Sequence, residues 1–278
     1  MKKRKKSSGK NRLFNLLIAV IIVVGVALIV YPGFSDWWNN LHQSRAVAAY
    51  VEKVADLSKE EYDSMWNEAV EYNKTLLNNN DRFTPTDEED ATYRSILDVT
   101  GTGIMGYIDI PSIDVELPVY HGTDDTVLQI AVGHIEGSSF PVGGEGTHCV
   151  VSGHTGLPSA KLFTDISKLK NGDTFKLQVL DRTLTYQVDQ IDVVLPNQLD
   201  DLAIDPSQDY CTLVTCTPYG VNTHRLLVRG HRIPTAADDA RITADALQLD
   251  KAYMAPALIV IMTLLAAVCL IVRARRQR

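Results

Sequence analysis

The stretch Tyr107-Ile-Asp-Ile-Pro-Ser-Ile-Asp-Val-Glu-Leu117 decides the fold of this chain. Apolar and polar side chains alternate on both sides of Pro111, as they do in strands that bury one face. The same period of two marks further strand candidates, at residues 148–151, 174–180, 182–188, 190–195, 209–215 and 225–230. Glycine-rich turns such as 143–146 separate them, and one short helix is expected around 159–169. Many short strands at close spacing predict a closed β-barrel.

Upstream of the barrel, residues 36–80 are predicted to be helical. Apolar residues recur at helical spacing on one face of each half, at Leu41, Ala48 and Val51 and then at Met65, Trp66, Ala69 and Leu76. Ser58-Lys-Glu-Glu61 is a capping box, so a second helix is expected to start there. Residues 78–90 are polar and contain Pro85, which predicts a long loop of the kind that is functional or disordered.

Two apolar runs lie near the ends of the chain, at 13–32 and 252–272. Each is close to the ~20 residues that a helix needs to cross the hydrocarbon layer of a membrane. The first could instead be a cleaved signal peptide, but it is longer than a usual signal and no small-x-small site follows before Trp37-Trp38. We therefore predict two transmembrane helices, with a linker over 235–251 before the second.

Charge is segregated along the chain. Of the 27 Lys and Arg, 11 lie in the tails 1–12 and 273–278, which contain no acid, so the middle carries 16 cations against all 34 Asp and Glu. Basic tails place both termini in the cytoplasm and the middle outside the cell, in a multi-pass protein of the cell membrane. A middle with a formal charge of −18 excludes nucleic acid as its partner, because phosphate binding requires a basic face.

The segment Thr212-Leu-Val-Thr-Cys-Thr-Pro-Tyr-Gly-Val-Asn-Thr-His-Arg-Leu-Leu-Val-Arg-Gly230 is the most informative for chemistry. An apolar strand ends at Cys216, Pro218 and Gly220 turn the chain, and a new strand begins near Arg225. A thiol at the mouth of a barrel beside a guanidinium is placed to act as a thiolate. From these residues alone, however, a buried structural cysteine is the commoner outcome. The four cysteines are too sparse for a disulfide framework, and no C-x-x-C or H-E-x-x-H pattern indicates a metal site.

Thr-Leu-Val-Thr-Cys216, with Arg225 nine residues later, resembles the signature of the sortase family. The segment that begins Val151-Ser-Gly-His154-Thr-Gly resembles the histidine segment of that family. Gly106-Tyr-Ile-Asp-Ile-Pro and Leu117-Pro-Val-Tyr-His-Gly-Thr are similar to class C, the sortases that polymerise pilins. The resemblance extends from about Asn78 to Ile233. It implies a mainly β chain with a closed sortase-type barrel of about eight strands over 91–234, N-terminal helices and two transmembrane helices.

The resemblance also implies a mechanism. Cys216 would attack the Thr–Gly carbonyl of an LPXTG-like sorting signal and form a thioester. His154 would protonate the leaving amine and deprotonate the incoming one, and Arg225 would hold the oxyanion and the bound signal. In class C the incoming amine is a lysine of another pilin subunit, so the partners are pilins that carry the signal and the acceptor lysine. The reaction requires no cofactor, no ATP and no metal.

The resemblance also ranks His154 above other histidines, which the sequence alone does not do; these are His121, His134, His148, His224 and His231. Arg229 and Arg232 are expected to be structural or solvated cations, and Asp165 and Asp173 to lie at the surface or in turns. Cys149 and Cys211 precede His154 and Cys216 by five residues each. If their strands are neighbours, as in the family, the two thiols lie close together, and we expect both to be buried and reduced because adjacent parallel strands rarely offer disulfide geometry.

In class C sortases, a lid before the barrel carries an Asp-Pro-aromatic motif that fills the catalytic groove. This chain has Asp81-Arg82-Phe83 at the corresponding place, within 78–90. The resemblance implies an autoinhibitory lid in which Asp81 pairs with Arg225 and Phe83 covers Cys216. Because Arg82 does not fix φ as proline does, the lid is expected to be looser than is usual in the family. The alternative is an ordinary polar linker.

Two other functions remain open at this stage. A sortase of another class would attach proteins to the cell wall; the second apolar run and the 78–90 loop count against it. A doubly anchored adaptor with a β-barrel ectodomain would have no catalytic thiol. Detection of a peptide thioester on the chain separates an enzyme from an adaptor.

Overall fold

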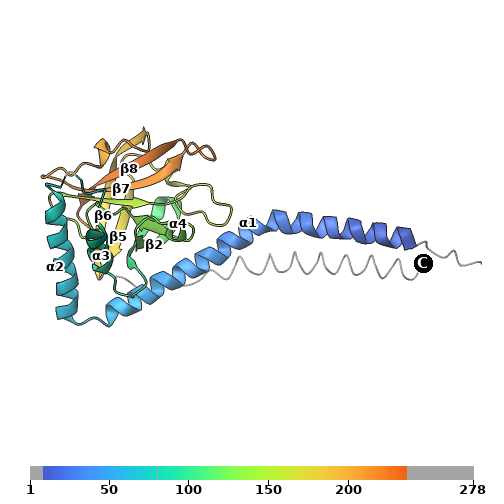
Figure 1. The fold of residues 1–278 in the computed structure, drawn as a ribbon, viewed down its shortest axis with the longest axis horizontal. Coiled ribbons are helices and arrows are strands. Elements are labelled where there is room, and N and C mark those ends of the chain that lie inside the picture. Colours follow the sequence, from blue (N-terminus) through green and yellow to red (C-terminus); the bar gives the residue numbers. More distant parts are fainter. Residues whose placement is uncertain (1–8, 80, 237–278) are drawn as a thin grey trace, which may run out of the picture. The chain divides into compact units, whose positions relative to one another are not determined.

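The computed structural model describes residues 9–79 and 81–236. The centre of this part is a closed barrel in the strand order β1-β2-β3-β4-β7-β8-β6-β5. Figure 1 shows the barrel with β2, β5, β6, β7 and β8 labelled. The strands are β1 (Ile104–Ile110), β2 (Val115–His121), β3 (Val132–His134), β4 (Thr147–Ser152), β5 (Thr174–Val179), β6 (Arg182–Val194), β7 (Asp209–Thr217) and β8 (His224–Ile233). The predicted closed barrel of about eight strands is therefore confirmed.

Strand pairing brings distant segments together. β4 and β7 are parallel neighbours, with Cys149 opposite Cys211 and Ser152 opposite Val214. β7 and β8 are antiparallel, with Cys216 opposite Arg225. The carboxyl ends of β4 and β7 and the start of β8 therefore meet at one end of the barrel.

The alternation read from the sequence places apolar side chains inside the barrel. Ile108, Val151, Leu213 and Val228 are fully buried in one core cluster. Burial of such a side chain stabilises the fold by about 1.5–3 kcal/mol. A one-residue slip of any of these strands, which would turn its buried side chains outward, is therefore strongly disfavoured.

Two local expectations were wrong. The helix expected over 159–169 is reduced to a 3-10 turn, η2 (Ile166–Lys168), because Leu162 has a left-handed φ of 38° that ends any helix there. The two strands expected over 182–188 and 190–195 form one strand, β6, because a bulge between Val188 and Gln190 absorbs the break in pattern. Further short elements are η1 (Pro111–Ile113), α4 (Asp125–Leu128) and η3 (Asp200–Leu202).

Helix α1 (Gly9–Ala55) continues through Pro32 without a break. Its Val20–Ala55 part contains an apolar window with a mean hydropathy of 1.9, none of it buried. It is the one helix among the described residues that is long and apolar enough to cross a membrane. The predicted span 13–32 and the first predicted helix of 36–80 thus belong to one helix. The second predicted span, 252–272, lies outside the described residues.

The last turns of α1 pack against the barrel. The tyrosine hydroxyl of Tyr50 donates to the carbonyl of Met105 (3.0 Å) and accepts from the amide of Leu180 (2.7 Å). The fully buried face of this helix is made by Gln43, Val47, Tyr50 and Val54. The predicted face, at Leu41, Ala48 and Val51, is half-buried and flanks it.

Helix α2 (Lys59–Leu76) starts at the predicted capping box, where the Ser58 hydroxyl and the Glu61 carboxylate each accept a backbone amide of the other residue. It lies along one side of the barrel (Figure 1). Ala69 and Leu76 are buried as expected. Asn73 is also buried and exchanges two hydrogen bonds with the backbone of Phe140, of 2.7 and 3.1 Å, which fixes the helix along the barrel.

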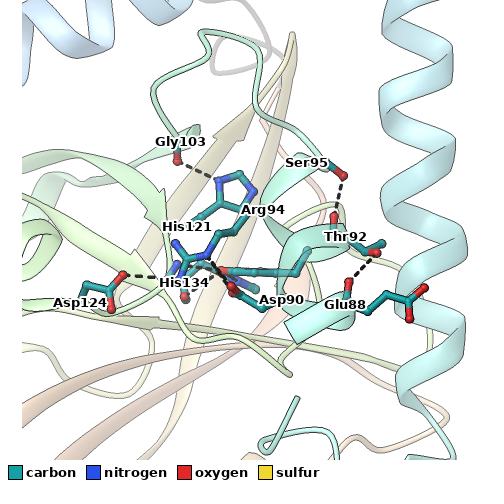
Figure 2. A network of polar contacts seen from close by, with 11 residues as sticks. Glu88, Asp90, Thr92, Arg94, Ser95, Gly103, His121, Asp124 and His134 are labelled. Carbon is teal, nitrogen blue, oxygen red and sulfur yellow. Dashed lines mark hydrogen bonds and ion pairs between the residues drawn. The ribbon is translucent and has the colours of Figure 1, made fainter. Parts of the chain in front are cut away.

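The loop expected over 78–90 ends earlier than predicted. A second capping box, between Thr86 and Glu89, starts helix α3 (Asp87–Ser95). Arg94 of this helix pairs with Asp90 (2.8 Å) and reaches Asp124 (3.5 Å), as Figure 2 shows. The acidic residues that suggested a loop are instead the first turn of a helix, where carboxylates interact favourably with the helix dipole.

Candidate active site

Three elements deliver the predicted catalytic residues to the same end of the barrel. Cys216 lies near the end of β7, opposite Arg225 at the start of β8. His154 follows β4 by two residues, and the β4–β7 register, continued past Ser152–Val214, places it beside Cys216. The amide of Gly153 donates to the carbonyl of Val214 (3.0 Å), and the Thr215 hydroxyl donates to the carbonyl of Gly153 (2.7 Å). These two bonds hold the backbone before His154 against the backbone before Cys216.

Successive side chains of β7 point to opposite faces of the sheet, and this alternation decides which of them are accessible. Cys211 and Leu213 belong to the barrel core and are fully buried. Val214 belongs to a second apolar cluster on the opposite face of the strand, and Cys216, two residues later, shares that face. Cys216 is half-exposed, whereas Cys149 and Cys211 are buried. Of the described cysteines, Cys216 is therefore the one that a substrate can reach.

The guanidinium of Arg225 is oriented by the turn that precedes it. Its Nη1 donates to the backbone carbonyls of Asn222 (3.3 Å) and His224 (3.1 Å). Its Nε and Nη2 make no hydrogen bond to any described residue. A planar fork with free donors beside a nucleophile is suited to bind a developing oxyanion or a carbonyl of a bound peptide.

Three of the other five predicted candidates have structural roles, whereas His224 lies one register pair from Cys216 and Arg225 on the β7–β8 ladder, opposite Thr217. His121 bonds the carbonyls of Gly103 and Ile96, and His134 bonds Tyr93, Ser138 and the carbonyl of Ser139; both are buried (Figure 2). His148 is buried between the carbonyl of Ala203 (2.8 Å) and the Thr212 hydroxyl (2.7 Å). Burial lowers the pKa of His148 to about 4, so it is neutral at physiological pH.

Two expectations about charged residues are confirmed. Arg229 forms a two-point ion pair with Asp189 (3.0 and 3.2 Å) and stacks on Tyr210, which makes it structural. Asp165 pairs at the surface with Lys161 and Lys168, and the pair with Lys168 is the leading cause that lowers its pKa. Asp173 accepts from the amide of Lys170 in a turn.

The two remaining thiols of the described chain meet inside the barrel. Cys149 and Cys211 are register partners on the parallel strands β4 and β7, as expected, and both are buried free thiols. Burial raises the pKa of the Cys211 thiol well above its usual range. Both side chains belong to the buried core cluster, so no substrate reaches either thiol.

The segment that the sequence predicts to be a lid lies on the same face as Cys216. Phe83 packs against an apolar cluster of Val150, Leu202, Val214 and Leu227, together with Ile135 and Val194. Val214 and Leu227 are register partners on the β7–β8 ladder, two pairs before the pair of Cys216 and Arg225. Phe83 thus covers the apolar floor that leads to the thiol.

Arg82 anchors this segment, a role that the sequence did not indicate. Its Nη2 donates to the carbonyl of Leu202 (2.7 Å), and its guanidinium lies 4.5 Å from the centre of the Phe83 ring. Burial lowers its pKa. Gly137, at φ +83°, faces the Arg82 carbonyl so closely that a Cβ there would overlap it. These contacts hold the segment in the described structure, and a lid looser than is usual in the family stays a prediction.

The expected pair between Asp81 and Arg225 is not formed in the described structure. Asp81 is exposed, and its own backbone closes a turn: its amide donates to Asn79 Oδ1, and its carbonyl accepts from Thr84. Arg225 is held by backbone carbonyls of its own turn. The ion pair that the lid prediction requires between Asp81 and Arg225 is therefore absent from the described structure, and Arg82 makes the anchoring contact in this segment.

Comparisons with known proteins agree with this geometry. Residues 108–233 match the family model described as the sortase domain. The solved structure of sortase C1 from Streptococcus agalactiae is 52% identical, with a TM-score of 0.68 over 69% of this chain and 100% of that one. Sortase C from Streptococcus pneumoniae is 44% identical (TM-score 0.62, 69% and 98% covered), and sortase C from Clostridium perfringens, solved with its C-terminal cell wall sorting motif, is 45% identical (TM-score 0.59, 69% and 99% covered).

A closed barrel with a reachable thiol, a histidine and an arginine at one end, in this framework, defines a cysteine transpeptidase. The chain belongs to the sortase family, and the structures that it resembles at 41–52% identity are those of class C.

Proposed function

We propose that this chain polymerises pilins. The observation that carries the proposal is the register that sets Cys216 opposite Arg225, with Gly153, the residue before His154, hydrogen-bonded to the backbone and side chain just before Cys216. The similarity to class C structures supports the pilin assignment, since the S. pneumoniae structure is described in terms of pilin substrate specificity.

In the first half-reaction, the Cys216 thiolate attacks the carbonyl carbon of the Thr–Gly bond in an LPXTG-like sorting signal. Arg225 stabilises the oxyanion through its unengaged Nε and Nη2 donors. His154 gives a proton to the departing glycine amine. The Thr carbonyl is then held as a thioester on Sγ, and the peptide C-terminal to Thr leaves.

In the second half-reaction, a lysine amine of another pilin subunit attacks the thioester. His154 takes the proton of that amine, and Sγ leaves as a thiolate. The product is an isopeptide bond between the two subunits. The thioester keeps the acyl group activated after the peptide bond is cleaved, so the exchange requires no nucleotide.

The lid segment keeps the resting groove closed in this proposal. Phe83 occupies the apolar floor beside Cys216, and Arg82 clamps it to Leu202. A sorting signal must displace Phe83 before its own apolar residues reach the same floor.

Membrane attachment by both predicted spans, 13–32 and 252–272, completes the proposal. The exposed apolar half of α1 supports the first span. With both tails in the cytoplasm, the barrel faces the outside of the cell, where sorting signals are presented.

The acyl-enzyme trapped in cells provides the test. Wild-type chain and Cys216→Ala are purified from cells that express pilins, and thiol-linked peptides are identified by mass spectrometry. We expect a peptide that ends in Thr on Cys216, and pilin as its source. A surface protein that is not a pilin would instead support a cell-wall-anchoring sortase, and no thioester at all would support the adaptor.

A further inference from the structure

Helix α1 contacts the barrel next to its catalytic end. Asn39 Nδ2 donates to the carbonyl of Ser159 (2.7 Å), and the amide of Lys161 donates to Asp36 Oδ1 (2.9 Å). Ser159 and Lys161 lie five and seven residues after His154. One turn further along α1, Gln43 Nε2 donates to the carbonyl of Ile130 (2.6 Å).

The part of α1 that makes these contacts directly follows its apolar half. Ile29 is 81% exposed and precedes an aromatic cluster of Phe34, Trp37 and Trp38, whose ring centres are 5.7–6.3 Å apart. Aromatic side chains at the end of a membrane-spanning helix lie at the level of the lipid headgroups. Asp36 and Asn39 are within one helical turn of that cluster, so the contacts place residues 159–161 at the same level.

Exposed apolar side chains gather around the same end of the barrel. Tyr219 is 70% exposed and Val221 is 63% exposed, and both lie in the turn that follows Cys216. The Tyr219 ring closes against Gly156, at φ +74°, where a Cβ would come within 2.9 Å of it. Ile130, whose carbonyl accepts from Gln43, is 48% exposed. Pro158, which precedes Ser159, is also exposed. We call Ile130, Pro158, Tyr219 and Val221 the mouth rim.

We propose that the mouth rim contacts the headgroup layer of the cell membrane, so that the catalytic end of the barrel opens at the bilayer surface. The proposal rests on membrane attachment through α1, which is part of the proposed function. The carbonyl of Ile130 accepts from α1 and Pro158 precedes Ser159, which also accepts from α1. Tyr219 contacts Gly156, and Val221 lies in the same turn as Tyr219, after Cys216. Amphipathic aromatic groups such as Tyr219 are suited to this layer, because one end is apolar and the other can be hydrated.

The arrangement has a consequence for the substrate class. A rim at the bilayer surface favours a sorting signal that is itself held close to the membrane by an apolar segment. The thiol is then presented at the height where such a segment leaves the lipid. A soluble peptide gains nothing from this placement.

Lipid quenching of single labels tests the contact. The full chain with Cys216→Ala and Cys269→Ala carries one new cysteine, labelled with a small fluorophore, in vesicles of phosphatidylcholine and phosphatidylglycerol that contain headgroup-nitroxide lipid. Val221→Cys reports the mouth rim. Glu145→Cys, in the exposed turn before β4, reports the opposite end of that strand, and Ser35→Cys reports the anchor. We expect at least about a twofold loss of fluorescence at 221 and at 35, and little at 145.

Quenching at 35 without quenching at 221 would overturn the proposal while leaving attachment through α1 intact. No quenching at 35 would remove attachment itself, and the proposal with it. Equal quenching at 221 and 145 would also overturn it, because the barrel would then lie on its side.

A second measurement separates lipid contact from substrate binding. Val221→Asp is assayed on a sorting-signal peptide in solution and on the same peptide anchored in the vesicles by an apolar tail. We expect a several-fold lower rate on the anchored peptide and an unchanged rate on the soluble one, because a charge is disfavoured in the interface. An equal loss on both would assign the residue to substrate binding and not to the membrane.

Discussion

Cys211 and Cys216 lie five residues apart on the same strand, β7, but their surroundings differ. Cys211, with its partner Cys149, is sealed in the core, whereas Cys216 is half-exposed beside Arg225. An odd offset along a strand turns a side chain to the opposite face. The contrast teaches that position on a strand, and not the thiol itself, separates a core residue from a nucleophile.

The largest effect is expected from removal of the exposed thiol. Cys216→Ala abolishes transpeptidation and leaves the melting temperature within a few degrees, because only a half-exposed sulfur is lost. Cys211→Ala is the matched variant: it retains activity but lowers stability by roughly 1–2 kcal/mol through the cavity that it leaves. Turnover of a sorting-signal peptide and thermal unfolding are measured on both. Loss of activity in a folded Cys211→Ala would remove the contrast.

Arg225→Lys is expected to reduce turnover by roughly 10²-fold or more, because a point ammonium does not replace a planar guanidinium at a developing oxyanion. Arg229→Lys, on the same face of β8, is the control and lowers stability through its pair with Asp189 without a comparable loss of rate. The rate constant for acylation is the relevant measurement. Near wild-type acylation in Arg225→Lys would contradict the oxyanion role.

His148, which precedes Cys149 on β4, extends the comparison to the pH dependence of stability. The pKa of His148 is lowered by burial to about 4, below its usual 6.5, so its contribution to stability is present above pH 6.5 and is lost as pH falls toward 4. The loss reaches about 3 kcal/mol at most. Urea unfolding between pH 7 and 4.5 measures it, and His148→Gln, which does not titrate, should show a smaller dependence on pH. An unchanged dependence would assign the acid sensitivity to other groups.

The lid segment should protect Cys216. Asp81→Ala combined with Phe83→Ala is expected to speed modification of Cys216 by a bulky thiol reagent several-fold, with little change in melting temperature, because the apolar floor is uncovered. Arg82→Ala alone should have much of this effect, since it releases the clamp on Leu202, whereas Asp81→Ala alone should have little. Labelling rates of the three variants decide it. An unchanged rate in the double variant would mean that the segment does not guard the thiol.

The smallest effect concerns the buried pair. After free thiols are blocked, intact mass with and without reductant should be the same, because Cys149 and Cys211 remain reduced on adjacent parallel strands. A difference of two hydrogens would show a disulfide and would give the core thiols a redox role.

The barrel followed from the sequence because it depends on strand periodicity, and the register that sets Cys216 opposite Arg225 agrees with the order of motifs in the chain. Alternation identified the strands, and the order of motifs identified the partners. Asp165, Asp173 and Arg229 took the roles expected of them for the same reason: each acts through near neighbours in the chain or ladder.

The lid contacts could not be predicted from the sequence, because they join residues that are more than 100 positions apart in the chain. Arg82 and Leu202 are 120 residues apart, and no local pattern indicates that the guanidinium replaces the usual ion pair. Helix α3 was missed for a different reason. The capping box at Thr86 was present in the sequence, but an acidic cluster after Pro85 was interpreted as loop.

Gly137 allows the lid segment to pack closely against it because glycine has no Cβ atom. Since any side chain at this position would collide with the Arg82 carbonyl, and would also have to adopt a left-handed φ, Gly137→Ala acts as a wedge at the base of the lid. Such a variant would displace the lid segment without any change to Cys216, His154 or Arg225. One added methyl group at Gly137 would thus leave the apolar cluster beneath Phe83 uncovered at rest, at the expense of local stability.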